Sequence, residues 1–172
     1  MPFVSESIEI RRATQADFEA IWSIFQAVIA TGDTYLFSPD ASRQDTQDYW
    51  FGAGITSFVA VEGERILGAY RLLANQRDLG SHVANASFMV SATARGKGIG
   101  KALGRHCLVE ARRAGFRAMQ FNFVVCTNTG AVALWKDLGF VIVGTLPEAF
   151  RHQRLGYVDA YVMYRFLDDI EV

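Results

Sequence analysis

A cluster of glycines and basic residues lies between an apolar segment and an amphipathic one. The apolar segment ends in Phe-Met-Val at 88–90, and positions 95–101 read Arg-Gly-Lys-Gly-Ile-Gly-Lys. Glycines at a strand-to-helix junction allow positive φ angles, while the first turn of a helix presents unpaired N–H groups and the positive end of the helix dipole. This chemistry favours a phosphate or diphosphate. The residues expected to hold it are Arg95, Gly96, Lys97, Gly98, Ile99, Gly100 and Lys101.

The alternative is that these glycines only make a tight connection. Two common phosphate loops do not fit, because a P-loop needs Gly-x-x-x-x-Gly-Lys-Ser/Thr and the dinucleotide fingerprint needs Gly-x-Gly-x-x-Gly. The pattern here is Arg95-x-x-Gly98-x-Gly100.

The composition excludes several classes of protein. A chain of 172 residues with 51% hydrophobic and 20% charged residues is expected to fold as one globular domain over 1–172. A net charge of -1 gives no reason to expect nucleic-acid binding. No apolar run is long enough for a membrane span, so we expect a cytoplasmic protein. The scattered histidines and the two cysteines, which are expected to be reduced, predict no metal site.

Hydrophobic periodicity predicts the order β-α-α-β-β-β-α-β-α-β-β. Strand–helix–strand alternation in the second half indicates a parallel pair within an otherwise antiparallel α/β (α+β) sheet, with helices covering it. The expected strands are 8–12, 58–61, 66–73, 84–90, 119–125, 141–143 and 158–167, with a turn-rich segment over 147–156. The expected helices begin near 14, 46, 99 and 128.

Two motifs carry a resemblance to a known family. The pattern at 95–100 resembles the acetyl-CoA-binding motif of the Gcn5-related N-acetyltransferases (GNAT). The run Asn-x-x-Ala-x-x-Leu-Trp-x-x-Leu-Gly-Phe from Asn128 to Phe140 is similar to a second helix motif of that family. The predicted element order also matches the family's fold over essentially the whole chain.

The resemblance implies roles for residues around a splayed pair of strands. The pantetheine arm of acetyl-CoA would lie between the strand ending at Val90 and the strand ending near Cys126. Main-chain groups of Met89 and Val90 would bond it from one side and Asn128 from the other. An N–H near Met89 or Val90 would stabilise the oxyanion as an amine attacks the thioester directly. A carboxylate or a water chain would take the proton of that amine.

One position departs from the family pattern. The family's usual general acid is a tyrosine, and Trp135 stands in its place. The thiolate of CoA would then leave unaided, take its proton from water, or use Tyr157, Tyr161 or Cys126. Trp135 itself has the alternative role of core packing. A non-catalytic acyl-CoA-binding module is the corresponding rival hypothesis.

The acceptor is predicted from four residues. Asn85 and Asn122 look like asparagines of the fungal acetyltransferases that act on azetidine-2-carboxylate, where they engage a small amino acid. The alternative is that each amide bonds a local backbone group. Tyr35 and Phe37 lie in a loop and either line the acceptor pocket or fix the loop to the core.

These residues imply a closed pocket for a small-molecule amine. A protein or peptide acetyltransferase is the enzymatic rival, and it would need an open acidic groove. Many relatives in the family form dimers, so the resemblance also makes a homodimer an expectation.

Overall fold

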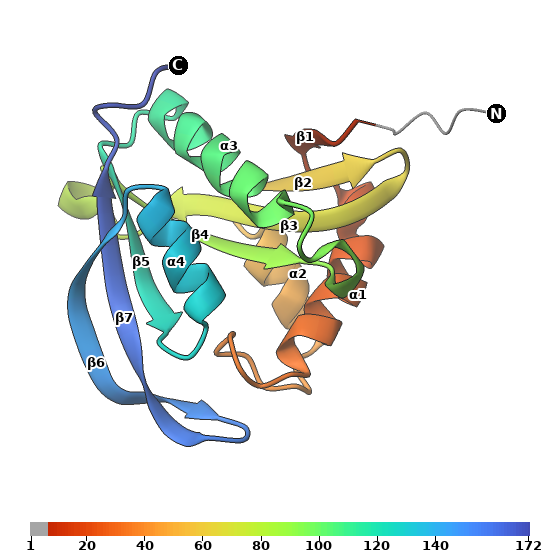
Figure 1. The fold of residues 1–172 in the computed structure, drawn as a ribbon. Coiled ribbons are helices and arrows are strands. Elements are labelled where there is room, and N and C mark those ends of the chain that lie inside the picture. The colour runs from red at the N-terminus through yellow and green to blue at the C-terminus, as the bar shows by residue number, and fades with distance from the viewer. Residues whose placement is uncertain (1–6) are drawn as a thin grey trace.

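The computed structural model describes residues 7–172, and the helices and strands follow in the predicted order (Figure 1). The strands are β1 (Glu9–Arg12), β2 (Thr56–Glu62), β3 (Arg65–Ala74), β4 (Val83–Val90), β5 (Ala118–Val125), β6 (Val141–His152) and β7 (Gly156–Phe166). The helices are α1 (Phe18–Ile29), α2 (Arg43–Phe51), α3 (Ile99–Arg113) and α4 (Thr129–Asp137), with short 3₁₀ turns at Gln15–Asp17, Asp78–Gly80 and Ala92–Ala94. No helix within 7–172 is long and apolar enough to cross a membrane.

The strands form one mixed sheet. Their order is β1-β2-β3-β4-β5-β7-β6, and every pair is antiparallel except β4 with β5, which is parallel. The helix α3 connects the two parallel strands, as a parallel connection requires. The predicted mixed sheet with one parallel pair is therefore confirmed.

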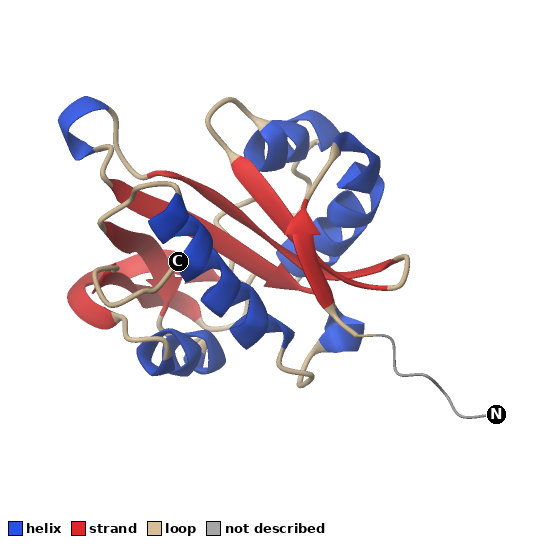
Figure 2. Ribbon diagram, turned by 90° about the horizontal axis from the view of Figure 1, so that it is seen from above, coloured by secondary structure: helices blue, strands red, loops and turns tan. Residues whose placement is uncertain are grey.

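Helices cover both faces of this sheet (Figure 2). On one face α1 and α2 pack over a core of large side chains that includes Phe25 and Trp50. On the other face α3 and α4 pack over Leu103, Met119 and Met163. Alternation along β4 sends neighbouring side chains into the two cores in turn, so one strand contributes to both sides of the sheet.

Local sequence signals set the helix ends. Ser42 caps α2, since its hydroxyl accepts a hydrogen bond from the N–H of Asp45 at 3.0 Å. Asn128 caps α4 in the same way. Gly115 and Gly139 follow α3 and α4 with φ angles of 89° and 88°, the left-handed conformation common just after a helix.

The last hairpin differs from its prediction. The segment 147–156 was expected to be mostly turn, but β6 continues through it to His152. Pro147 is tolerated because β6 is an edge strand. Glu148 has φ 51° at an irregularity, where its N–H donates to the carboxylate of Asp159 at 2.9 Å. The hairpin tip reaches the α1–α2 segment, where the N–H of Gln153 donates to the carbonyl of Gly32 at 3.1 Å.

Candidate active site

A fork between β4 and β5 lies at the centre of the candidate site. The two strands pair only at Val83 with Ala118 and at Ala84 with Met119, and then diverge (Figure 1). At the point of divergence, the side-chain amide of Asn85 donates to the main-chain carbonyl of Gln120 at 2.8 Å. A side chain thus replaces the next hydrogen bond between the strands. Beyond it, no main-chain pairing joins the two strands.

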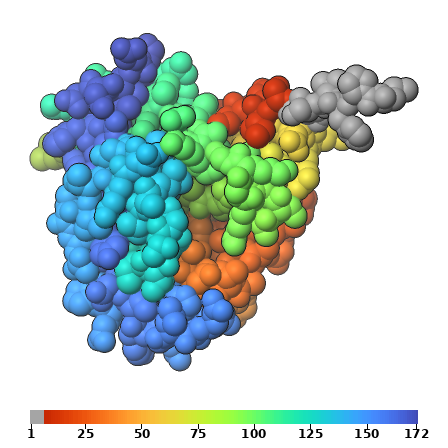
Figure 3. All heavy atoms as spheres, in the orientation of Figure 1, coloured from red at the N-terminus to blue at the C-terminus, as the bar shows by residue number. Residues whose placement is uncertain are grey.

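A cavity of about 870 Å³ occupies this fork and reaches both faces of the sheet. Its walls come from the turn before α3, from α4, from β3, β4 and β5, and from the segment between α1 and α2. Figure 3 shows the surface hollowed between the cyan residues of α4 and the green residues of that turn, with orange residues behind. One elongated ligand could therefore pass from the α3–α4 face to the α1–α2 face.

The glycine turn forms the end of the cavity on the α3–α4 face. Gly96 and Gly98 have φ angles of 78° and 77°, and a Cβ on either would meet nothing within 4 Å, so backbone conformation and not crowding selects glycine. Gly98 is the N-cap residue of α3, and no side chain caps the helix. The N–H groups of the first turn are thus available to an anion.

Seven residues between 95 and 101 were predicted to hold a phosphate, and six of them line the cavity. Lys97 is the exception, because it lies in the same turn but does not line the cavity. The ammonium group of Lys101 forms an ion pair with Asp137 of α4, and this bond lowers the pKa of that carboxyl. Part of the positive charge predicted for this turn is therefore already paired within the protein. Arg95 and the helix end provide the rest.

The hydrogen-bond register decides which main-chain groups of β4 face the fork. The N–H of Ser91 donates to the carbonyl of Leu67 in β3 at 2.8 Å. Because main-chain groups alternate along a strand, those of Met89 also face β3, while those of Phe88 and Val90 face the fork. The main chain of Met89 is therefore bonded to β3 and not turned to the fork, contrary to the expectation, whereas that of Val90 faces the fork.

Four residues of the second motif line the α4 side of the cavity, among them Asn128 and Trp135. The Asn128 side-chain oxygen accepts from the N–H of Ala131 at 3.3 Å, which leaves its amide N–H₂ free to donate. The Trp135 side chain is 7% exposed, with its ring centroid 4.7 Å from that of Phe88 and 4.8 Å from that of Phe121. Trp135 therefore packs in the core and presents only part of its surface to the cavity.

Aromatic residues of α2 and of the loop before it line the opposite end and pack on Phe25 of α1. The Tyr35 hydroxyl donates to the carbonyl of Phe88 at 2.7 Å, and its ring lies edge-on to Phe25 at 5.3 Å. Phe37 makes a similar contact with Phe25 at 5.1 Å. Desolvation raises the pKa of the Tyr35 phenol well above its usual value, so it stays protonated. Both predicted roles coexist, since these rings fix the loop and also line the cavity.

The structure brings the two predicted asparagines to the cavity and gives each a protein partner. Asn85 bridges the fork, as described above. Asn122 donates to the side-chain oxygen of Asn75 at 2.6 Å and accepts from the side-chain amide of Gln120 at 2.8 Å. The local hydrogen bonds considered as the alternative are thus present, and both side chains still line the cavity.

Three further residues lie at this end that the sequence did not predict. Arg71 of β3 lies opposite Ser87 of β4, and the centre of its guanidinium lies 3.4 Å from the ring centroid of Tyr49 in α2. The Tyr49 hydroxyl donates to the Ser87 hydroxyl at 2.7 Å. The only sequence signal was a charged residue inside an apolar strand. Its partners are far along the chain.

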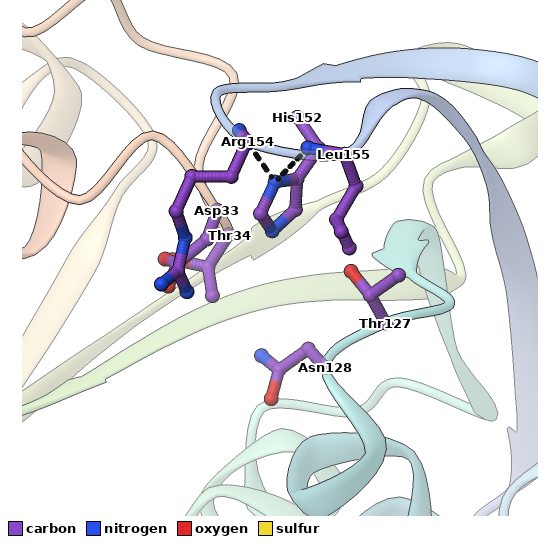
Figure 4. Close-up of a pocket in the computed structure, with 7 residues that line it drawn as sticks. All are labelled: Asp33, Thr34, Thr127, Asn128, His152, Arg154 and Leu155. Carbon is purple, nitrogen blue, oxygen red and sulfur yellow. Dashed lines mark hydrogen bonds between the residues drawn. The ribbon is translucent and has the colours of Figure 1, made fainter.

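A smaller cavity of about 260 Å³ adjoins the large one and shares Asp33, Thr34 and Asn128 with it (Figure 4). The β6–β7 tip contributes His152, whose Nδ1 accepts from the N–H groups of Arg154 and Leu155 at 3.1 and 3.2 Å. In the neutral ring, Nε2 therefore carries the proton. The C-terminal hairpin thus forms one wall of the smaller cavity, where the sequence predicted only a turn-rich segment.

Few acid–base groups line the large cavity. Asp33 supplies the one carboxylate among the lining residues that the structure describes. The alternative proton donors Tyr157, Tyr161 and Cys126 line neither cavity. The site therefore combines main-chain donors for an anion at the glycine turn with a strand edge of β4 that does not pair with β5. Its pocket contains the carboxylate of Asp33 and the guanidinium of Arg71, which forms no ion pair with a residue in 7–172.

The family model described as "Acetyltransferase (GNAT) family" matches residues 18–140. This range includes the glycine turn, the fork and α4. The chain is also 34% identical over 158 residues to the N-acetyltransferase aca1 of Schizosaccharomyces pombe, which covers 80% of this chain and 75% of that protein.

Solved structures share the fold. A GCN5-related N-acetyltransferase from Kribbella flavida superposes with a TM-score of 0.89 and 43% identity, covering 94% of this chain and 98% of that one. A GNAT phosphinothricin acetyltransferase from Sinorhizobium meliloti, solved in complex with acetyl-CoA, has a TM-score of 0.82 and 24% identity, covering 92% and 88%. The second likeness concerns the fold alone.

Proposed function

The chain belongs to the acetyltransferase (GNAT) family and is an acetyl-CoA-dependent N-acetyltransferase, and we propose that its acceptor is the amine of a small amino acid or an analogue of one. The observation that carries the proposal is one cavity running from the glycine turn through the fork to an aromatic pocket. A pocket lined by the rings of Tyr35 and Phe37 suits a small acceptor better than a peptide, which needs a long groove. The likeness to enzymes acting on azetidine-2-carboxylate belongs to this proposal.

The residues present fit acetyl-CoA, which supplies the acetyl thioester. In our proposal the N–H groups of the first turn of α3, with Arg95, hold the diphosphate, and the free amide of Asn128 donates to the pantetheine arm. The N–H of Val90 faces the fork, where it would stabilise negative charge on the acetyl oxygen. Trp135 packs beside this arm as a core residue.

The reaction also needs a proton acceptor, since an amine attacks only when neutral. We assign this role to the carboxylate of Asp33, because it is the one acidic side chain lining the cavity within residues 7–172. The proton would pass to it directly or through one water. Asn85 joins the two strands at the closed end of the fork, and Asn122 lines the pocket beside it.

An amine panel tests the proposal. Purified protein is mixed with acetyl-CoA and each of a set of amino acids, amino-acid amides, polyamines and short peptides, and the free thiol of CoA is measured. We expect release only with small amines. Release with peptides alone would replace the proposal by peptide acetylation. Tight CoA binding by calorimetry without any release would indicate a non-catalytic acyl-CoA-binding module.

The proposal extends to three properties of the whole chain. Residues 1–172 would act as one acetyltransferase domain, located in the cytoplasm and assembled as a homodimer. Light scattering on the eluted protein tests the dimer, because a mass near that of one chain would exclude it.

A further inference from the structure

Arg71 is a half-buried cation without an anionic partner. Within residues 7–172 its guanidinium forms no ion pair. Its Nη1 donates to the Tyr49 carbonyl at 3.0 Å, and its Nε lies 3.5 Å from the Ser87 hydroxyl. A guanidinium has five N–H donors, so several of them remain for another partner. Keeping a charge partly out of water without a counter-ion is costly, which points to an anionic ligand.

The neighbours of Arg71 hold it in one orientation. Tyr49 packs against the guanidinium face with 3.4 Å between the ring centroid and Cζ, and its carbonyl belongs to the last turn of α2, where carbonyls lack helical partners. These contacts fix the plane of the guanidinium and leave its edge available. A fixed, planar fork suits the two oxygens of a carboxylate.

Ser87 adds a second donor beside this fork. Its oxygen accepts from the Tyr49 hydroxyl at 2.7 Å, so its own proton is free to be donated. Arg71 and Ser87 are directly opposite across β3 and β4, and such a pair points to the same face of the sheet. Both line the large cavity on the α1–α2 side. Together they present positive charge and several donors to one small volume.

This volume lies close to the proposed reaction centre. Ser87 lies three residues before Val90 at the open end of β4, and three residues along a strand span roughly 10 Å. Arg71 and Ser87 line the same cavity as Val90, so an acceptor bound at Arg71 would direct its amine into the cavity that contains the fork.

We propose that Arg71, with Ser87, binds the carboxylate of the acceptor and makes this enzyme selective for amines that carry one. The inference rests on the proposed function and adds the residue that determines specificity. Asn122 and Asn85 would then contact the rest of the acceptor and need not bind its charge.

The test compares each amino acid with its primary amide, which keeps the amine and removes the carboxylate. Wild type, Arg71→Gln and Arg71→Lys are assayed for kcat/KM by thiol release. Arg77→Gln serves as the matched control, since Arg77 is exposed and does not line the cavity. Thermal melting of every variant separates folding from selectivity.

We expect wild type to prefer the acids by about 10–100-fold, the range of a charged hydrogen-bonded contact. In Arg71→Gln this preference should be lost because KM for the acid rises. The kcat/KM for the amide should change by less than about threefold, and KM for acetyl-CoA should stay the same. Arg71→Lys should retain part of it, because the charge stays and the fork is lost. Equal use of acids and amides by wild type, or equal losses of both in Arg71→Gln, would overturn the inference while the proposed function stands.

A binding measurement keeps the inference independent of turnover. N-acetylated amino acids and their amides are titrated calorimetrically into the CoA-bound protein. Binding of the acid by wild type and not by Arg71→Gln supports the carboxylate site even if no amine in the panel is acetylated, in which case only the proposed function fails. Absence of binding of every acid to wild type refutes the carboxylate site.

Discussion

The two ends of the cavity are built in different ways. At the α3–α4 end, the hydrogen-bond donors facing the cavity come from one short segment, 95–101, through the N–H groups of a helix start and the Arg95 side chain, and from Asn128, the cap of the next helix. At the α1–α2 end, they are side chains from a loop, a helix and three strands. The first end depends on local backbone geometry, and the second depends on how distant elements pack.

Because of this difference, the two ends recognise different parts of the ligands. Main-chain donors at a helix N-terminus suit a phosphate whatever the rest of the ligand is. Side-chain donors such as Arg71 and Ser87 can be changed one at a time while the main-chain groups of the sheet stay the same. We therefore expect substitutions at the first end to abolish cofactor binding and those at the second to change which amine is used.

Gly98→Glu should give the largest effect at the cofactor end. A side chain at φ 77° costs about 1–2 kcal/mol, and the added carboxylate repels phosphate. We expect Kd for CoA, measured by calorimetry, to rise at least about 100-fold. Gly115→Glu is the matched control, since Gly115 has φ 89° but lies after α3, away from the cavity. Wild-type affinity for CoA in Gly98→Glu would refute diphosphate binding by the glycine turn.

Asp33→Asn should give the next largest effect, now on chemistry and not on cofactor binding. Loss of a general base typically lowers kcat by about 10²–10⁴-fold. Kd for CoA should stay unchanged, because Asp33 lies at the acceptor end. The pH profile of kcat distinguishes the base from a residue that only shapes the pocket. An unchanged kcat would show that water accepts the proton without Asp33.

Asn85→Ala tests the junction between the two ends. Removing the bridge leaves the Gln120 carbonyl without its donor, at a cost of about 1–3 kcal/mol, and we expect kcat/KM to fall about tenfold together with the melting temperature. Asn122→Ala is the comparison, because Asn122 is exposed and its amide bonds only other side chains. Equal losses of activity in both variants without any change in melting would instead favour direct contacts of both amides with the acceptor.

Trp135→Tyr should change kcat by less than about threefold. The ring packs among Phe88, Phe121 and Phe140, so the expected cost is in stability, roughly 1–2 kcal/mol for the altered packing. The variant restores the family's acid residue type, and Trp135→Phe is its control without a hydroxyl. A gain in kcat of about 10²-fold in the tyrosine variant alone would show that the departing thiolate needs an acid.

The geometry of the glycine turn and of the α4 cap follows from the sequence because its signals are local. Glycines at 96 and 98 need positive φ, and Asn128 caps a helix three residues before Ala131, so spacing alone is informative. The acceptor end was predicted only in part. Arg71 contacts residues 16 and 22 positions away, and such contacts depend on strand register and helix docking.

Strand register also explains the error at Met89. A sequence identifies a strand but not which edge each N–H faces, and a shift of one residue reverses every orientation. The hydrogen bond between Ser91 and Leu67 fixes this choice. The long β6 was missed for a related reason, since Pro147 normally indicates a turn and is acceptable only at a sheet edge.

Asp17→Asn should give the smallest effect on activity and serves as a reference for the acceptor end. The Arg11 guanidinium donates to both carboxylate oxygens of Asp17 at 2.9 and 2.8 Å, and the N–H of Thr14 donates at 2.8 Å. The Arg11 hydrogen bonds lower the pKa of Asp17 from 3.8 to about 2. The ionised form is thus favoured by folding, so this stabilisation is complete above about pH 4 and is lost as the pH falls toward 2.

For this variant we expect a loss of about 1–2 kcal/mol at neutral pH, or about 3–6 °C in melting temperature. The difference from wild type should shrink in melts between pH 4 and 2, because protonation removes the same interaction from the wild type. The preference for acids over amides should not change, since Asp17 anchors the start of α1 and does not line the cavity. A changed preference would mean that acceptor selectivity depends on the placement of α1 as well as on Arg71.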